Sequence, residues 1–302
     1  MGKRNIIISG ALGQDGIILS NLLSKNNYNI IGVVKKIPLK KGNKKVNYIK
    51  LDLNNLKKVN KLINDYNPLA FIHLGSANPS YKEVKKNNFY KKNFLTAKNL
   101  INCFAKFKKN KLILIGSSQM YSLKKKKINL SSKFLYNNSY ARFRIDTFKY
   151  MKKIKDKFNS NIVTAILFNH DSINRNQKFL IPRLISIIKN KKYRYLENIY
   201  KENISGDFSH AEDICIGLKK LIFLKKNPDK LIFSSNKRTY INDLIKFLLK
   251  ENKINYKFNA PKKSTNTPIG DNTLTKSILK WKLKKNIFIA TRELNSVFNK
   301  KN

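Results

Sequence analysis

The chain has 302 residues, 41% of them hydrophobic, which is enough for a substantial core and, at roughly 150 residues per domain, for two lobes. No apolar run approaches the ~18 residues of a membrane span, and the first one is too short and too rich in glycine for a signal peptide. We therefore expect a cytoplasmic protein without a membrane partner.

The formal net charge of +47 raises the question of nucleic-acid binding, because clustered cations bind a phosphate backbone. Only eight of the 64 basic residues are arginine, the cation preferred for planar recognition of phosphates and bases. The lysines are spread over the whole chain, and their densest runs, 35–45 and 124–127, have the character of solvated loops. We therefore predict no specific nucleic-acid partner, but a nonspecific attraction to polyanions.

Strand-like and helix-like patterns alternate through the first 170 residues. Helical periodicity is seen at 54–66 and 86–107, between runs rich in Ile, Val and Leu. The runs that we expect to be strands are 5–9, 29–34, 46–53, 70–76, 111–118 and 161–168. This alternation predicts an α/β fold with a doubly wound parallel sheet of the Rossmann type, which binds ligands beyond the carboxyl ends of its strands.

The pattern changes after residue 170. Longer helical patterns cover 178–190, 212–225, 239–252 and 287–299, with short strands expected at 230–235 and 256–259. We predict a dinucleotide-binding domain over 1–170 and a smaller α/β substrate-binding lobe over 171–302, within which strands of the first sheet can recur.

A glycine-rich turn follows the first strand. In "GALGQDG" the glycines are Gly10, Gly13 and Gly16, with Gln14 and Asp15 between the last two, and a helix opens at once. Glycines at this position let the backbone approach a pyrophosphate, while the helix N-terminus supplies a positive dipole. This context, strand before and helix after, predicts a dinucleotide site.

Three further strand ends are expected to complete that site. Lys35 and Lys36 stand where an acid would bind a ribose 2′-hydroxyl, so NADP is the expected cofactor, with NAD as the alternative. Asp52 and Leu53 are placed for the adenine. Leu74, Gly75 and Ser76 are placed for the groove on the nicotinamide side.

The predicted chemical groups lie on "GSSQMY" and "SYARFR". Ser117 and Gln119 follow the fifth strand, and Tyr140 opens the next helix with Arg144 one turn further along the same face. A free tyrosine has a pKa near ~10, too high for an efficient base at neutral pH, and a nearby cation stabilises its phenolate. We predict that Tyr140 is an acid/base residue.

These motifs resemble the extended short-chain dehydrogenase/reductases, and within them the GDP-mannose 4,6-dehydratases. "SGALGQDG" is similar to their cofactor turn, "ILFNHDS" and "FLIPRL" to the start of their substrate lobe, and "GDFSHAEDI" and "GDNTLTKSILKWK" to two later segments. The resemblance implies NADP, a nucleotide-sugar substrate such as GDP-mannose, and a homo-oligomer. It also implies that Tyr140 is the base, that Ser117 binds the reacting oxygen, and that Asn169 and Arg183 bind the substrate.

Several positions depart from the family pattern. Gln119 replaces the catalytic glutamate, and an amide cannot accept the proton from carbon 5 of the sugar. Arg144 replaces the lysine, which keeps the charge but changes its geometry. Asn78 and Pro79 replace a Ser-His pair, Gly206 replaces an arginine before Asp207, and "APKKST" lacks the family's Arg-Pro-x-Glu.

Three interpretations stay open at this point. The chain is a dehydratase-like enzyme with reduced or rerouted elimination, a reductase or epimerase of a 4-keto nucleotide sugar, or a catalytically silent homologue that binds nucleotide. Both cysteines, Cys103 and Cys215, are expected to be buried free thiols, and no residues suggest a metal site. His73 is expected in the core, while His170 and His210 are expected to position loops.

Overall fold

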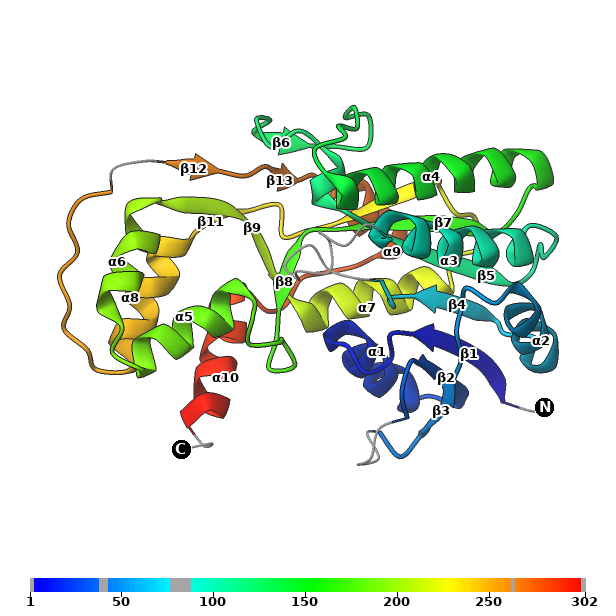
Figure 1. Ribbon diagram of the computed structural model, residues 1–302, viewed down its shortest axis with the longest axis horizontal. Coiled ribbons are helices and arrows are strands. Elements are labelled where there is room, and N and C mark those ends of the chain that lie inside the picture. Colours follow the sequence, from blue (N-terminus) through cyan, green and yellow to red (C-terminus); the bar gives the residue numbers. More distant parts are fainter. Residues whose placement is uncertain (1–2, 38–42, 77–87, 262–263, 300–302) are drawn as a thin grey trace.

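Three consecutive isoleucines lie at the centre of the fold. Ile6, Ile7 and Ile8 are completely buried in strand β1 (Arg4–Ser9), because a central parallel strand is covered on both faces and therefore needs apolar side chains on both. The computed structural model describes residues 3–37, 43–76, 88–261 and 264–299, and Figure 1 shows how its layers are arranged.

A seven-stranded parallel sheet forms the core of the larger part. Its members are β1, β2 (Tyr28–Val34), β3 (Val46–Lys50), β4 (Ala70–His73), β5 (Lys111–Ser117), β7 (Ile162–Leu167) and β10 (Lys230–Phe233). Their spatial order is β10-β7-β5-β4-β1-β2-β3, and every neighbouring pair is parallel. The strand order reverses between β1 and β4, so a ligand crevice is expected where these two strands end. The predicted doubly wound sheet is confirmed.

Helices cover both faces of this sheet and build the second lobe. The helices are α1 (Gln14–Ser24), α2 (Leu56–Tyr66), α3 (Phe89–Phe104), α4 (Ser139–Phe158), α5 (Leu180–Lys189), α6 (Tyr193–Lys201), α7 (Ala211–Ile222), α8 (Ile241–Glu251), α9 (Thr273–Leu279), α10 (Ile287–Asn299) and the short 3₁₀ helix η2 (Ser118–Met120). None of the helices in these described ranges is long and apolar enough to cross a bilayer.

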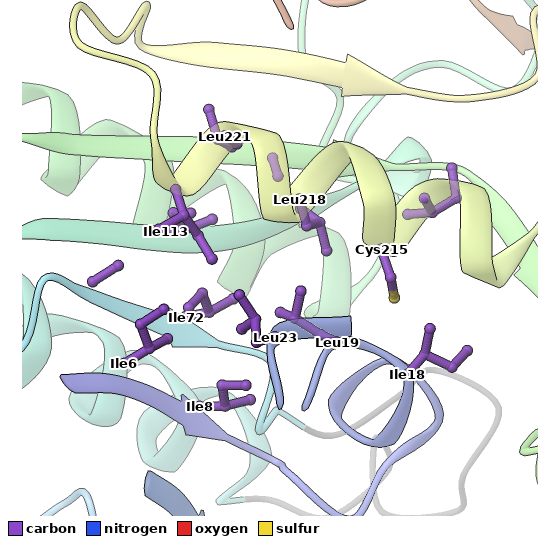
Figure 2. Packing of buried hydrophobic residues seen from close by; sticks show 14 of the residues in the cluster. Ile6, Ile8, Ile18, Leu19, Leu23, Ile72, Ile113, Cys215, Leu218 and Leu221 are labelled. Carbon is purple, nitrogen blue, oxygen red and sulfur yellow. The ribbon is translucent and has the colours of Figure 1, made fainter. Parts of the chain in front are cut away.

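Alternate side chains of the strands belong to two separate cores. Ile6 and Ile8 pack with α1 and α7, and Figure 2 shows them facing Leu19, Leu23 and Leu218. Ile7, on the opposite face, packs with α2, α3 and α4. Helices on both faces are what a parallel sheet requires, because its crossover connections are helical.

The second lobe has its own core, formed by α5, α6, α8 and α10. A small sheet borders it, made of β8 (Asn169–Asp171), β9 (Ile204–His210), β11 (Arg238–Tyr240) and β12 (Thr265–Asn266), while β13 (Ile269–Gly270) pairs with β6 (Lys127–Ile128). Between these lobe elements the chain returns to the first part, where β10 joins the large sheet and α7 packs beside α1 (Figure 1).

One predicted strand is wrong. Residues 256–259 lie in neither a helix nor a strand. The alternating apolar side chains are used instead for ring contacts, since Tyr256 stacks on Tyr193 at 5.0 Å between centroids and Phe258 stacks on Tyr200 at 4.0 Å. Two short helices, α6 and α9, were not expected from the sequence.

Several turns hold a left-handed backbone without glycine. The helices α2, α4 and α9 end at Asn67, Asn159 and Lys280, all with positive φ. Asparagine tolerates this conformation better than other non-glycine residues, whereas lysine has no such advantage. Lys191 and Lys253 also adopt a positive φ.

Candidate active site

The glycine turn brings bare backbone to the crevice between β1 and β4. Gly10 has a φ of 71°, and a Cβ there would lie 2.8 Å from the Cα of Gly75. A Cβ on Gly16 would collide with the carbonyl oxygen of Gly10. Gly13 is the N-cap of α1, so the helix N-terminus faces the turn without a covering side chain. Backbone packed this tightly fits the pyrophosphate of a dinucleotide.

A cleft of about 820 Å³ extends from this turn along the ends of β1, β2, β3 and β4. The predicted residues that line it are Gly10, Lys35, Asp52, Leu53, Gly75 and Ser76. The other residues predicted to bind the cofactor are not part of its lining, namely Gly13, Gln14, Asp15, Gly16, Lys36, Leu74, Tyr140 and Arg144. Lys50, Asn54 and Lys92 line it as well, and sequence reasoning missed all three.

The far end of the cleft is held by hydrogen bonds. The Asp52 carboxylate accepts from the backbone and side-chain nitrogens of Asn54, each at 3.1 Å. Thr96 on α3 donates to the side-chain oxygen of Asn54 at 2.9 Å, so this strand end is tied to a helix. The signal for Asn54 lay in its Asp-Leu-Asn spacing, which is typical of an Asx turn.

Ser9 joins the ends of β1 and β4. Its hydroxyl lies 2.7 Å from Nδ1 of His73 and accepts a hydrogen bond from the backbone nitrogen of Gly75 at 3.3 Å. Burial, together with the charge of Arg144, lowers the pKa of His73 to about 3, so this ring is neutral. His73 is thus the core histidine that was predicted, and it fixes the crevice geometry.

Arg144 lies buried beneath Tyr140 on the first turns of α4. Its guanidinium is 5.2 Å from the centre of the Tyr140 ring and donates to the carbonyl oxygen of Ile115 and to the hydroxyl of Ser76, both at 2.5 Å. The buried Nε has no hydrogen-bond partner in the described part of the chain. The predicted pair is therefore in contact, and Arg144 links it to the strand ends of β4 and β5.

Ser117 and Gln119 lie at the end of β5, against which α4 packs. The Ser117 hydroxyl accepts from the backbone nitrogen of Gln119 at 3.2 Å, which leaves its own hydrogen free to donate elsewhere. Asn137 donates to the carbonyl oxygens of Gln119 and Tyr121, at 3.3 and 3.0 Å. The N-cap Asn138 then starts α4, so η2 and the turn that presents Tyr140 are one hydrogen-bonded unit.

Gln14 and Asp15 point toward the second lobe, where their side chains meet β8. The Gln14 amide donates to the carbonyl oxygen of His170 at 3.2 Å, and the Asp15 carboxylate lies 3.0 Å from Nε2 of His170. Both were predicted to bind the cofactor, yet the contacts described are with β8. Residues 155 positions apart carry no local signal for such a contact.

Besides Ser117 at the end of β5, two further residues were predicted to bind the substrate. Asn169 opens β8 and Arg183 lies in the first turn of α5, and both side chains are exposed. The glycine at position 206, where the family has an arginine, has a local structural explanation. A Cβ at this position would collide with the hydroxyl of Thr267. Asn78 and Pro79 lie outside the described residues.

Both cysteines lie as predicted, whereas His210 was expected to position a loop and instead ends β9. His210 caps α7 by accepting from the backbone nitrogen of Glu212, and it contacts Glu293. Cys103 and Cys215 are buried free thiols. Among the described residues, no group of three or more His, Cys, Asp or Glu side chains is arranged to bind a metal ion.

Comparison with known proteins identifies the family. The model of the family described as GDP-mannose 4,6 dehydratase matches residues 7–288. No curated protein matches the sequence well enough to count as a relative.

Solved structures show the same fold at low identity. A UDP-glucuronic acid 4-epimerase from Bacillus cereus in complex with NAD has a TM-score of 0.79 at 17% identity, over 98% of this chain and 99% of that one. A dTDP-glucose 4,6-dehydratase from Bacillus anthracis in complex with NAD has a TM-score of 0.80 at 13% identity, over 99% and 97%. A UDP-glucose 4-epimerase from Thermotoga maritima with UDP-glucose has a TM-score of 0.80 at 15% identity, over 98% and 99%.

The family match covers nearly the whole chain, and it includes both the glycine turn and the segment with Tyr140 and Arg144. The chain therefore belongs to the GDP-mannose 4,6-dehydratase family, within the NAD-dependent epimerase/dehydratase enzymes of the short-chain dehydrogenase/reductase superfamily.

Proposed function

We propose that this protein is an NADP-dependent enzyme that transfers hydride at carbon 4 of a nucleotide sugar, with GDP-mannose as the first substrate to test. The observation that carries the proposal is the contact of Tyr140 with the buried guanidinium of Arg144, which is tied to Ser76 in the cofactor cleft. Family membership and the nucleotide-sugar ligands named for the similar structures support the same substrate class.

The side chains have distinct roles in this proposal. A bound nicotinamide would supply the acceptor, or in the reverse direction the donor, of the hydride. As hydride leaves carbon 4 of the sugar, Tyr140 takes the proton of the hydroxyl group on that carbon, and a ketone forms. Ser117 donates a hydrogen bond to the oxygen that becomes the ketone oxygen. Arg144 packs on the ring of Tyr140 and connects it to Ser76 in the cleft, which holds the phenol in position.

The preference for NADP rests on two strand ends. Val34 of β2 is the register partner of Lys50 of β3, so Lys50 and Lys35 come from neighbouring positions, and both line the cleft. Two ammonium groups favour the 2′-phosphate of NADP over the bare hydroxyl of NAD. Two of the similar structures contain NAD, which is a finding about those proteins and not about this chain.

The elimination step lacks its carboxylate base. In a dehydratase a carboxylate removes the proton from carbon 5 while water leaves from carbon 6, and Gln119 has no basic atom for this transfer. Among the described residues, the half-buried carboxylate of Asp15 pairs with His170 and the buried carboxylate of Asp171 pairs with Arg175. The buried carboxylates of Asp207 and Asp213 accept hydrogen bonds from backbone nitrogens. We therefore propose that dehydration is slow or absent, and that oxidation and reduction at carbon 4 remain.

This reasoning favours a second candidate, a reductase or epimerase of a 4-keto nucleotide sugar. Such an enzyme needs Ser117, Tyr140 and a cation but no glutamate. Turnover of a 4-keto sugar nucleotide with NADPH, without release of water from GDP-mannose, would select it.

A single assay series separates the alternatives. The purified protein is incubated with NADP⁺ and GDP-mannose, while absorbance at the nicotinamide band and formation of the 4-keto-6-deoxy product are followed. We expect hydride transfer with little or no product, and clear product from the variant Gln119→Glu with Arg144→Lys. NADP binding without hydride transfer to or from any sugar nucleotide would instead identify a silent homologue.

A further inference from the structure

A buried polar cluster lies beneath the phosphate turn, between α1 and β8. Nε2 of His170 is 3.0 and 3.1 Å from the two carboxylate oxygens of Asp15. Beside it, the Gln14 amide donates to the carbonyl oxygen of His170, and the Ser172 hydroxyl donates to the Gln14 side-chain oxygen at 3.1 Å. Four side chains thus join the first turn of α1 to the start of the second lobe.

The hydrogen-bond partners of His170 determine its protonation. Nδ1 lies 2.6 Å from the carbonyl oxygen of Phe168, which can only accept. Nε2 faces the Asp15 carboxylate, which also only accepts when ionised. Both ring nitrogens must therefore donate, so His170 is a positively charged imidazolium.

The ionisation of the pair agrees with this geometry. Burial opposes the charged form of both groups, but the charge and the hydrogen bond of His170 outweigh it and lower the pKa of Asp15 to about 2. Burial likewise acts to lower the pKa of His170, and Asp15 reverses this, so the pKa is raised above its usual value.

The groups around the pair are also accounted for. On β8 and the following turn, Asp171 pairs with Arg175 at 2.6 Å, and Arg175 lies 3.5 Å from the centre of the Phe179 ring. From α7, the Cys215 thiol donates to the backbone oxygen of Asp15 at 3.6 Å. The described cluster holds two carboxylates, Asp15 and Asp171, and two cations, His170 and Arg175. Loss of any one of these charges therefore leaves the cluster with a net charge.

The position of Asp15 gives the pair a consequence for binding. It lies in the first turn of the helix whose N-terminus faces the phosphate site, where an uncompensated carboxylate would repel a pyrophosphate. On the other side, His170 directly follows Asn169, the predicted substrate residue, on the same strand. The ion pair thus joins the turn at the predicted phosphate site to the strand that carries a predicted substrate residue.

We propose that Asp15 and His170 are positioning residues: the imidazolium cancels the carboxylate charge beneath the phosphate turn and fixes β8 to it, so that dinucleotide and nucleotide sugar strengthen each other's binding. The identity of these two ligands rests on the proposed function. The pair contacts neither ligand and acts through the backbone of the turn and through Asn169.

A mutant cycle tests the charge argument. His170→Gln should weaken NADPH binding about tenfold, because it leaves the half-buried carboxylate of Asp15 beneath the phosphates without its cation partner. Adding Asp15→Asn should recover most of that affinity, since the double variant has no charge to compensate. The matched control is His210→Gln, which removes another buried histidine that contacts a carboxylate, at 3.0 Å from Glu293, and should leave NADPH affinity unchanged.

Two readouts go beyond a general loss of structure. GDP-mannose should bind the wild type more tightly with NADPH present than without it, and His170→Gln should lose that gain. The ¹⁵N resonances of His170 should report a doubly protonated ring near neutral pH; with three histidines in the chain, His170→Gln identifies them directly. A neutral His170 ring, or a double variant no better than His170→Gln, would overturn the proposal.

Failure of the two proposals can be told apart. If the wild type binds NADPH but the His170→Gln variant binds it equally well, with the gain for GDP-mannose intact, the positioning role is wrong while the proposed function stands. If the wild type binds neither NADPH nor NADH, the proposed function is wrong, and the coupling between ligands is refuted with it.

Discussion

At the scale of single residues, Arg144 is the most informative side chain. A guanidinium has several donors in one plane, and here two of them reach Ile115 and Ser76 while its central carbon lies 5.2 Å from the centre of the Tyr140 ring. Lysine offers a point charge and could not make this set of contacts in the same geometry. The replacement therefore reorganises the connection between α4 and the cleft, in addition to keeping the charge.

Removing the phenolic hydroxyl tests the role of Tyr140. Tyr140→Phe should slow hydride transfer by about 10²- to 10⁴-fold, the usual effect of losing a general acid or base. NADPH affinity should change little, because the ring packing with Phe89 and Phe143 is kept. Single-turnover absorbance measures the rate, and the exposed Tyr136, as Tyr136→Phe, serves as control. Equal rates in both variants would exclude Tyr140 as the proton carrier.

Lysine variants test the preference for NADP. Lys35→Ala and Lys50→Ala should each weaken NADPH binding about tenfold, the effect of a lost charge-assisted hydrogen bond, and leave NADH affinity nearly unchanged. Lys36→Ala is the matched control, because Lys36 lies outside the cleft lining. Fluorescence titration with both cofactors measures this. If the Lys36 variant lost as much affinity, a diffuse field and not two specific contacts would explain the preference.

Part of the candidate site could be read from residue order alone. The glycine turn, Ser117, Tyr140 and Arg144 follow from motifs with fixed spacing along consecutive elements, and the structure brings Tyr140 and Arg144 together. Lys92 and the Asp15–His170 pair could not be found this way. They depend on the distance between elements far apart in the chain, which no local pattern encodes.

At the scale of elements, α7 ends on a buried lysine from the sheet. The ammonium of Lys111, the first residue of β5, donates to the carbonyl oxygens of Leu221 and Leu224, at 2.7 and 2.5 Å. The last carbonyls of a helix have no partner within the helix, so a cation from another element can satisfy them. This contact fixes α7, and with it the neighbouring α1, against the sheet.

Lys111→Met should therefore lower the free energy of unfolding by about 1–3 kcal/mol, the cost of leaving buried acceptors unpaired. Burial lowers the pKa of Lys111 to about 8, against 10.5 for the unfolded chain. The unfolded chain binds more protons between these values, so the contribution of Lys111 to stability should rise with pH across that window.

Denaturant unfolding at several pH values measures this, with the wild type compared to Lys111→Met so that other lysines cancel. Lys109→Met, at an exposed position nearby, is the control. A wild type and a Lys111 variant with equal stability at every pH would show that α7 needs no cap from β5.

The sheet could be predicted because buried parallel strands are continuous runs of Ile, Val and Leu. The short strands β6, β8, β11, β12 and β13 have two or three residues each and no such run, so only tertiary pairing reveals them. Segment 256–259 has the alternation of a strand, yet its aromatic rings pack on α6 and its backbone forms no strand. Periodicity reports which side chains are buried, and not which backbone they pair with.

At the scale of the whole molecule, the charge is the dominant property. Few of the lysines have acidic partners, because the chain has 17 acidic residues for 64 basic ones. Such an excess produces a long-range positive potential, which attracts phosphate compounds in general and is screened by salt.

Nonspecific polyanion binding should follow from this charge. A labelled single-stranded oligonucleotide of random sequence should bind at low salt and lose more than tenfold in affinity between about 50 and 200 mM salt. Fluorescence anisotropy over a salt series measures the slope, and a neutral polymer of similar size is the control. A preference for one sequence that survives at the higher salt would contradict our prediction of no specific nucleic-acid partner.

Three lysines in left-handed turns are sites where a single substitution should stabilise the folded protein. Lys191, Lys253 and Lys280 each occupy a conformation that glycine adopts without steric cost, so each change to glycine should raise the free energy of unfolding by about 1 kcal/mol. Thermal unfolding of the single and triple variants measures the gain; a loss at all three sites would show that these turns have no strain to relieve. A triple variant of this kind would be a tolerant background in which destabilising active-site changes, including the restored glutamate and lysine, could be compared without loss of the folded state.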